Sequence, residues 1–153
     1  MENKLKHLDM IQAVISRMAS NSFALKGWAV TLMAGIFALA SKDSDKMYFA
    51  IAFIPLIVFW FLDSYYLQQE RLFRNLYNKV RIEENDKKID FSMNVKVNNK
   101  DEIKKEKLSF FSCLFSMTEH LFYLPLCIVT LVICMNWVNI FSVFFEKIFS
   151  IGG

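Results

Sequence analysis

Two stretches of twenty residues, 22–41 and 47–66, are apolar apart from one charged side chain each, Lys26 in the first and Asp63 in the second. Because a helix rises 1.5 Å per residue, about 20 apolar residues are enough to cross the hydrocarbon core of a bilayer. The polar link between the stretches, 42–46, is only five residues long. This pattern predicts an antiparallel hairpin of two membrane-spanning helices.

The two charges should lie at similar depth in this hairpin. A chain that folds back near residue 44 brings position 26 opposite position 62, one residue from Asp63. Charged side chains inside spans are costly and usually face a bundle interior or a water-filled path. We expect Lys26, Asp63, Glu119 and His120 to form a polar layer near the cytoplasmic boundary. It would serve as a structural ion pair with Glu119 and His120 marking the interface, as a ring at a pore mouth, or as a proton or ion relay.

The helices of the hairpin should continue beyond the membrane. An apolar stripe with helical period begins at Leu5 and runs through Ile11 to Met18, and a second runs from Leu72 to Val80. Such stripes are typical of helices that bury one face. The sequence therefore predicts one unit over 1–83, with a single long helix over about 4–40 and a second helix that reaches about residue 83.

The segment 84–107 is polar and contains an alternating pattern over 89–97. Alternation of this kind predicts a strand with one buried face, here the face of Ile89, Phe91, Met93, Val95 and Val97. The sequence offers no second strand to pair with it. Three possibilities stay open, namely pairing with another copy, pairing with a partner protein, or an extended course against the cytoplasmic helices.

Residues 108–153 are again apolar. We expect an amphipathic helical lead-in over 108–118, a third span over about 119–138 and an interfacial tail, with one longer tilted helix from residue 109 as the alternative. Prolines should bend the second and third spans, at Pro55 and at Pro125. In the first span, small residues recur at close spacing and predict a face for helix packing, formed by Gly27, Thr31, Ala34, Gly35 and Ala38.

The basic residues predict the orientation. Fifteen of the eighteen Lys and Arg residues lie before residue 27 or within 68–107. Because cytoplasmic loops are enriched in Lys and Arg, the N-terminus and 68–107 should be cytoplasmic and the C-terminus external. The protein would then be a multi-pass protein of the bacterial inner membrane, in contact with the lipid bilayer.

Catalytic chemistry finds no support in the sequence, which has no Gly-rich phosphate loop, no nucleophile elbow and no paired carboxylate motif. The spacing of the three cysteines, Cys113, Cys127 and Cys134, matches no metal site, and buried inert thiols are expected. We therefore expect no enzyme, no cofactor and no bound metal. No nucleic acid is expected either, because acidic residues interrupt the basic segment.

A resemblance covers about half of the chain, from Ile11 to Arg81. It is carried by 17–23 (RMASNSF), 26–28 (KGW), 59–63 (FWFLD) and 69–74 (QERLFR). These segments resemble a widespread group of small, uncharacterised bacterial membrane proteins, and the resemblance implies architecture alone. More loosely, the layout is similar to that of membrane effectors in bacterial anti-phage defence, which oligomerise to breach the membrane.

These observations predict an all-α membrane protein, with a long transmembrane hairpin that has a cytoplasmic extension and a third transmembrane helix. Because three helices enclose too little space for a pore, we expect a homo-oligomer. The leading hypothesis is a channel-like membrane effector of antiviral defence. The alternative is a non-conducting membrane anchor or regulatory subunit that recruits a cytoplasmic protein partner through 84–107.

Overall fold

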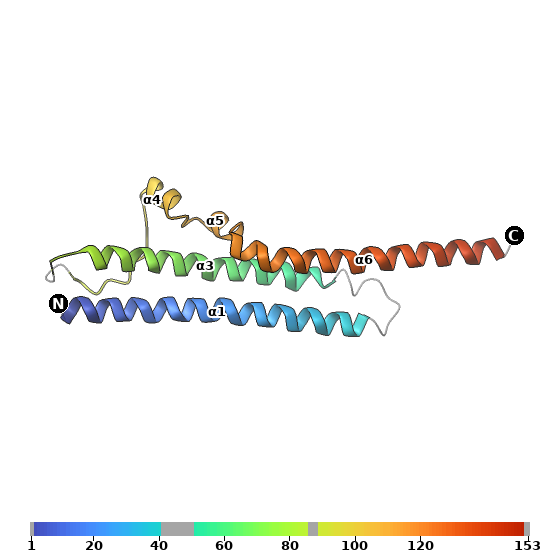
Figure 1. Ribbon diagram of the computed structural model, residues 1–153, viewed down its shortest axis with the longest axis horizontal. Coiled ribbons are helices and arrows are strands. Elements are labelled where there is room, and N and C mark those ends of the chain that lie inside the picture. Colours follow the sequence, from blue (N-terminus) through green and yellow to red (C-terminus); the bar gives the residue numbers. More distant parts are fainter. Residues whose placement is uncertain (1, 41–50, 86–88, 152–153) are drawn as a thin grey trace.

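The computed structural model describes residues 2–40, 51–85 and 89–151, with side chains up to residue 135. All regular structure in these ranges is helical (Figure 1). The predicted all-α class is therefore confirmed for the described residues. In chain order the helices are α1 (Glu2–Ala40), α3 (Phe53–Ile82), α4 (Lys100–Lys105), α5 (Phe110–Leu114) and α6 (Met117–Ile151).

Helices α1 and α3 lie side by side and antiparallel along most of their length (Figure 1). The prediction of a single helix over about 4–40 is confirmed, because α1 is continuous for 39 residues. The end of α3 at Ile82 also agrees with the expected boundary. The link 42–46 and the first four residues of the predicted second span lie outside the described residues.

Two apolar clusters hold the hairpin together. Near the chain's N-terminus, Ile11 and Ile15 of α1 bury against Val80 of α3, as the two apolar stripes predict. Toward the other end of the hairpin, Met33 of α1 and Leu56 of α3 form a second cluster, which Tyr123 of α6 joins. The second cluster therefore fixes the position of α6 as well as that of the hairpin.

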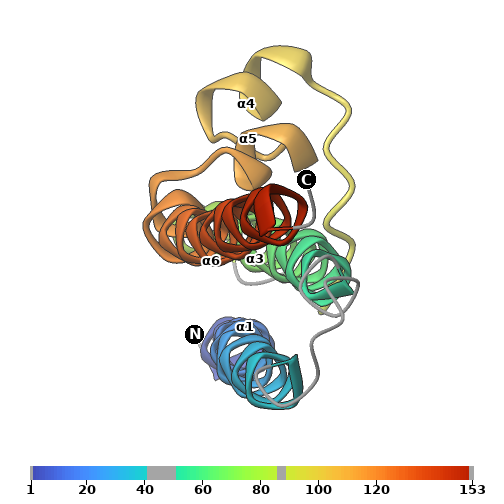
Figure 2. The same ribbon diagram turned by 90° about the vertical axis from the view of Figure 1, so that its right-hand side faces the viewer.

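Helix α6 lies against α3 and continues past the link end of the hairpin (Figures 1 and 2). It is a single helix of 35 residues, so the predicted interfacial tail is part of the same helix that contains the predicted third span. The lead-in is a separate short helix, α5, whose first N–H groups are capped by Ser109 through a bond from the Ser112 N–H (3.2 Å). The alternative prediction, one uninterrupted helix from residue 109, is therefore wrong, because α5 and α6 are separate helices.

Pro55 lies just after an interruption of the second helical stretch, since Ile51 is helical, Ala52 is in a turn and α3 begins at Phe53. It occupies the first turn of α3, two residues after Phe53. The N–H groups of a first turn have no intrahelical acceptor, so the missing N–H of proline costs no hydrogen bond there. Pro125 does lie inside α6.

No strand forms over 89–97 within the described single chain, and pairing of this segment with another copy or with a partner protein stays a prediction. Alternate backbone N–H groups bond to side chains two residues earlier: Ser92 to Asp90 (3.0 Å), Asn94 to Ser92 (3.4 Å) and Lys96 to Asn94 (3.0 Å). These local bonds replace a β ladder, because Asp, Ser and Asn side chains compete for backbone donors. Of the three possibilities, the single chain follows the last: the segment packs against α1 and α3, with Ile89 and Met93 on the first apolar cluster.

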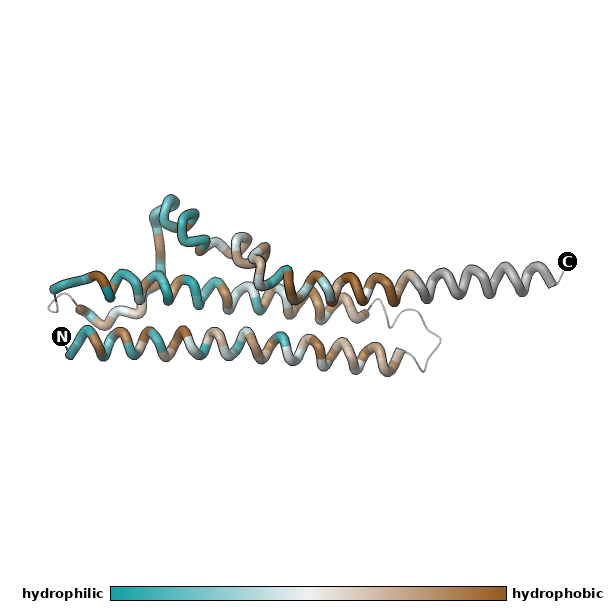
Figure 3. Tube along the Cα trace, in the orientation of Figure 1, coloured by the Kyte–Doolittle hydropathy of each residue, from teal (hydrophilic) through white to brown (hydrophobic). Residues whose placement is uncertain are grey.

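Two helical stretches are long and apolar enough to cross a membrane, Glu2–Ala40 and Lys100–Met135. The second includes the described side chains of α6. Hydropathy along the chain separates the two ends of the molecule (Figure 3). The end that holds the N-terminus and α4 is mainly hydrophilic, and the apolar residues concentrate toward the link end of the hairpin and along α6. The described part of α3 does not meet the same criterion by itself.

Candidate functional site: a buried charged cluster

Lys26 of α1, Asp63 of α3 and Glu119 of α6 meet between the three helices. The Lys26 ammonium forms an ion pair with Asp63 Oδ2 and lies 3.4 Å from Glu119 Oε1. The two hairpin charges therefore meet as predicted, and α6 brings Glu119 to the same point. We call these three residues, with Ser22 and Tyr123, the charged cluster.

Ser22 and Tyr123 complete the coordination of Asp63. The Ser22 hydroxyl donates to Asp63 Oδ1 and accepts from the Lys26 ammonium (3.1 Å). The Tyr123 hydroxyl lies 3.1 Å from Asp63 Oδ2 and 3.2 Å from the Phe59 carbonyl oxygen. Asp63 thus receives hydrogen bonds from three side chains.

The sequence prediction missed both hydroxyl residues, although helical spacing contained a signal. Ser22 precedes Lys26 by four residues and Tyr123 follows Glu119 by four residues. Residues four apart share a helix face, so each hydroxyl lies on the face that its charged neighbour presents to the cluster. A search for polar residues on those two faces would have found them.

The cluster is deeply buried and its formal charges do not balance. Asp63 and Glu119 are 0% and 1% exposed, whereas Lys26 keeps 22% of its surface. One cation therefore serves two carboxylates. Glu119 Oε2 accepts no hydrogen bond from the described residues. The rings of Phe122 and Tyr123, 5.8 and 6.0 Å from the ammonium, add cation–π contacts on the α6 side.

His120 lies outside the charged cluster, contrary to the expectation of one polar layer. Its Nδ1 lies 3.0 Å from the Ser116 carbonyl oxygen, and its ring packs beside Trp60 and Phe115. The reason is geometric, because successive residues of an α-helix point about 100° apart. Because Glu119 points into the space between α1, α3 and α6, the next residue, His120, points toward the rings of Trp60 and Phe115.

The predicted small-residue face lies away from the contact between α1 and α3. A Cβ placed on Gly27 or Gly35 would meet no atom within 4 Å. Thr31, Ala34 and Ala38 are also exposed, and the Thr31 hydroxyl donates to the Gly27 carbonyl of its own helix (2.9 Å). The face that α1 buries instead contains Ala29, Met33 and Ala40. A role for the small residues in contact between copies stays a prediction.

The predicted buried face of 89–97 is interrupted at one residue. Ile89, Met93, Val95 and Val97 are half-buried, but Phe91 is exposed and has a positive φ of 55°. Its ring instead lies 5.6 Å from that of His7 on α1, whose Nε2 is 3.1 Å from the Ser92 carbonyl oxygen. This turn of the backbone interrupts the alternation at Phe91, and the alternation of burial resumes from Met93 to Val97.

The described part of the chain shows no candidate metal site. No group of three or more His, Cys, Asp or Glu side chains there could hold a metal ion. The three cysteines are free, and Cys113 is fully buried. Burial raises the pKa of the Cys113 thiol, which keeps it in its unreactive protonated form at neutral pH.

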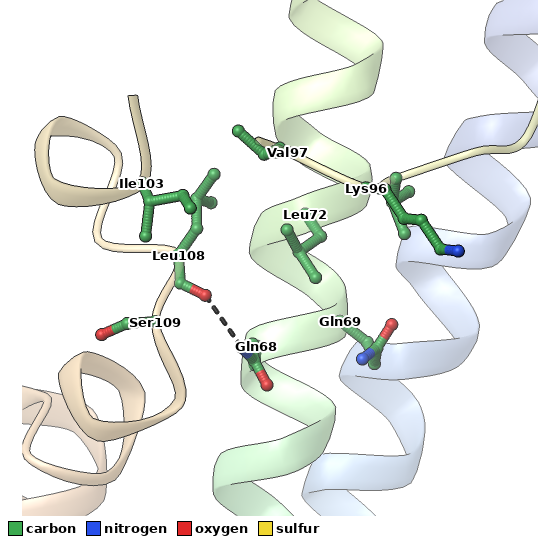
Figure 4. A pocket seen from close by; sticks show the side chains of 9 residues that line it. Gln68, Gln69, Leu72, Lys96, Val97, Ile103, Leu108 and Ser109 are labelled. Atoms are coloured by element: carbon green, nitrogen blue, oxygen red, sulfur yellow. Dashed lines mark hydrogen bonds between the residues drawn. The ribbon is translucent and has the colours of Figure 1, made fainter. Parts of the chain in front are cut away.

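One cavity of about 410 Å³ lies between α3, the segment 95–97 and the chain around α4 and α5 (Figure 4). Its lining is mainly apolar, with Leu72, Ile103 and Leu108 among the side chains that surround it. The Gln68 side chain is already engaged, because it donates to the Leu108 carbonyl oxygen (2.9 Å). This arrangement packs the returning chain onto α3 and presents no reactive group.

In comparisons with known proteins, no family model, curated protein or solved structure matches this chain.

Proposed function

We propose that this chain is a multi-pass protein of the bacterial inner membrane with three spans. The N-terminus and 68–107 would face the cytoplasm and the C-terminus would face outward. The two apolar helical stretches support insertion, and the basic residues concentrated before residue 27 and within 68–107 support the orientation. In this arrangement the charged cluster lies at the cytoplasmic boundary, at the ends of the first and second spans.

We further propose that the protein acts as an oligomeric, channel-like membrane effector, and the charged cluster is the observation that carries this proposal. Buried charges are costly in a membrane and are usually functional. Here they join α1, α3 and α6 within one protomer, with two carboxylates almost fully buried. The cluster would therefore hold the helices in a closed arrangement, and its separation in an oligomer would open a polar path.

Ion flux through liposomes tests this role. We expect purified protein to form oligomers, and we expect Lys26→Met to raise ion leak above that of the original chain by weakening the closed arrangement. Lys6→Met is the matched control, because Lys6 is an exposed lysine of the same helix. Monomers in detergent, or equal leak from both variants and the original chain, would exclude the channel-like role.

A non-conducting anchor is the second candidate, and α4 is the observation that favours it. This helix stands away from the hairpin and has no buried residue (Figure 2). It attaches through Glu102, which contacts Asn75 and Lys79 of α3. A partner could bind the exposed side of α4 without disturbing the hairpin. Recovery of the same cytoplasmic proteins with the chain and with a variant lacking 89–107 would exclude this role.

A further inference from the structure

A basic cavity of about 630 Å³ opens where α3, the chain before α5 and the start of α6 meet. Its polar lining consists of Arg71 and Lys107 with the hydroxyl residues Ser112, Ser116 and Thr118. None of the residues that line it is acidic. Two cations and three hydroxyl groups around one cavity without a carboxylate form a set of donors suited to an anion.

The two cations are available to a ligand. The Arg71 guanidinium donates to the Lys107 carbonyl oxygen (3.1 Å), and neither residue forms an ion pair within the described part of the chain. Most other charged side chains of α3 form ion pairs, as Arg74 does with Glu70 (2.8 Å). Arg71 also lies beside the buried Cys113 thiol, an uncharged neighbour at neutral pH.

The start of α6 adds backbone donors to the same cavity. Met117 and Thr118 begin this helix and line the cavity, and the first backbone bond into the helix comes from the His120 N–H to Ser116 (3.0 Å). The N–H groups of Met117, Thr118 and Glu119 therefore have no backbone acceptor within the described part of the chain. Such groups, at the positive end of a 35-residue helix, favour a negative charge.

The remaining lining is apolar and faces outward. Phe115, Met117 and Leu121 line the cavity and are all strongly exposed, Met117 to 87%. Leu121 continues the exposed apolar surface of α6, whereas Arg71 lies eight residues beyond Asp63, or ~12 Å along α3. The cavity thus has a cationic side toward the cytoplasmic half of the molecule and an apolar side toward the proposed membrane half.

We propose that the basic cavity binds one anionic glycerophospholipid of the inner leaflet. Its phosphodiester would be held by Arg71, Lys107 and the start of α6, and one acyl chain would pass over Phe115 and Leu121. A free phosphate would share the polar contacts but would leave the apolar side uncovered, and this difference favours the lipid. The inference rests on the proposed membrane insertion.

Tryptophan quenching by brominated lipids tests the site, because Trp60 lies beside the cavity. Its ring is 6.4 Å from that of Phe115. In the full-length chain with Trp28→Phe and Trp137→Phe, Trp60 is the sole tryptophan. This protein is placed in phosphatidylcholine vesicles that contain a small fraction of bromine-labelled phosphatidylglycerol or of bromine-labelled phosphatidylcholine, each labelled near the headgroup.

We expect phosphatidylglycerol to be preferred at Trp60 by on the order of tenfold, since Lys and Arg side chains near a membrane surface attract anionic lipid. Arg71→Gln with Lys107→Gln should abolish the preference. Arg74→Gln with Lys105→Gln is the matched control. It also removes one Arg and one Lys, but at residues of α3 and α4 that do not line the cavity. Millimolar glycerol phosphate or inorganic phosphate should not reduce the preference.

Equal quenching by the two lipids in the unsubstituted single-tryptophan protein would overturn the lipid site, and so would an equal loss of preference in the cavity and control variants. Displacement by free phosphate would assign the cavity to a soluble anion instead. Failure of both labelled lipids to quench Trp60 would mean that the chain is not in the bilayer, which overturns the proposed membrane function as well. If a cavity variant fails to fold, the lipid preference of the single-tryptophan protein with Arg71 and Lys107 intact still tests the lipid site.

Discussion

Lys26 is the cation that two buried carboxylates share in the described part of the chain. Asp63 has Ser22 and Tyr123 as further partners, and Lys26 also approaches Glu119 to 3.4 Å. Removing one member of a buried charged group is more costly than replacing the whole group, because the remaining charge keeps its desolvation penalty without compensation. The stability of the three-helix contact should therefore depend strongly on Lys26.

Lys26→Met should lower the free energy of unfolding by about 3–5 kcal/mol, as expected when a buried charge loses its partner. Reversible unfolding in mixed micelles would measure the change. Adding Asp63→Leu and Glu119→Gln to the same chain should restore much of the loss, because no buried carboxylate is then left unpaired. A Lys26→Met protein as stable as the Lys6→Met control would contradict this account of the cluster.

Tyr123→Phe removes the hydroxyl that joins Asp63 to α6 while it retains the buried ring. The expected loss of stability is about 1–3 kcal/mol, because a buried acceptor loses a donor. Tyr65→Phe provides the comparison, since Tyr65 is an exposed tyrosine of α3 and a surface change is expected to stay within about 0.5 kcal/mol. Equal unfolding midpoints for the two variants would show that the Tyr123 hydroxyl does not contribute.

Residue patterns in the sequence predicted Lys26 and Asp63 as a pair because their position depends only on where a straight hairpin folds back. They could not assign His120 correctly, because the turn between α5 and α6 determines which face of α6 meets α3. Pattern also gave no sign that Gly27 and Gly35 lie on the face opposite the hairpin contact. In this hairpin the buried face of α1 is instead the one that contains Ala29, Met33 and Ala40.

The elements differ in whether a long apolar pattern or a few short-range hydrogen bonds determine their conformation. Helices α1 and α3 follow from long periodic stripes, and so the extent of α1 and the end of α3 at Ile82 could be predicted from the sequence. The segment 89–97 has an equally regular pattern, but Asp90, Ser92 and Asn94 bond to nearby backbone N–H groups, and Phe91 turns the chain. Periodicity records which residues are apolar, and it does not record this competition for backbone donors.

Helix α4 shows the same dependence on a few polar contacts. Its N-cap is Asn99, which accepts a bond from the Asp101 N–H (3.0 Å). Glu102 then connects it to α3, with Asn75 Nδ2 at 2.6 Å and Lys79 Nζ at 2.5 Å from the same carboxylate oxygen. These hydrogen bonds, from Asn75 first and then from Lys79, lower the pKa of Glu102 from its ordinary value.

The attachment of α4 should therefore weaken in acid. Because the pKa of Glu102 is lowered in the folded protein, its stabilising contribution is present above its unfolded pKa of about 4.3 and is lost as the pH falls through the folded value. Spin labels on α3 and α4 should show a longer mean distance once the pH has fallen below the folded pKa of Glu102 than they show at pH 7. Glu102→Gln should show part of this change already at pH 7, and Glu106→Gln, an exposed residue at the end of the same helix, should not. A distance independent of pH would contradict the role of Glu102.

At the scale of the whole molecule, hydropathy and charge divide the protein in the same direction. The N-terminal part of α1 and the segment around α4 form the hydrophilic end, and the apolar parts of α1 and α6 extend away from it (Figure 3). The charged cluster lies between these two parts and ties together the three helices that continue into the apolar part. The proposed spans, their orientation and the lipid site all depend on this polarity.

Cysteine accessibility in intact cells tests this arrangement most directly. With Cys113, Cys127 and Cys134 replaced by Ser or Ala, single cysteines are introduced at Ser44, in the predicted link, and at Asp90, in the segment that packs against α1 and α3. A membrane-impermeant maleimide should label position 44 from outside the cell, and position 90 should react only after the membrane is opened. Labelling of both positions from the same side, or recovery of the chain in the soluble fraction without detergent, would contradict the proposed topology.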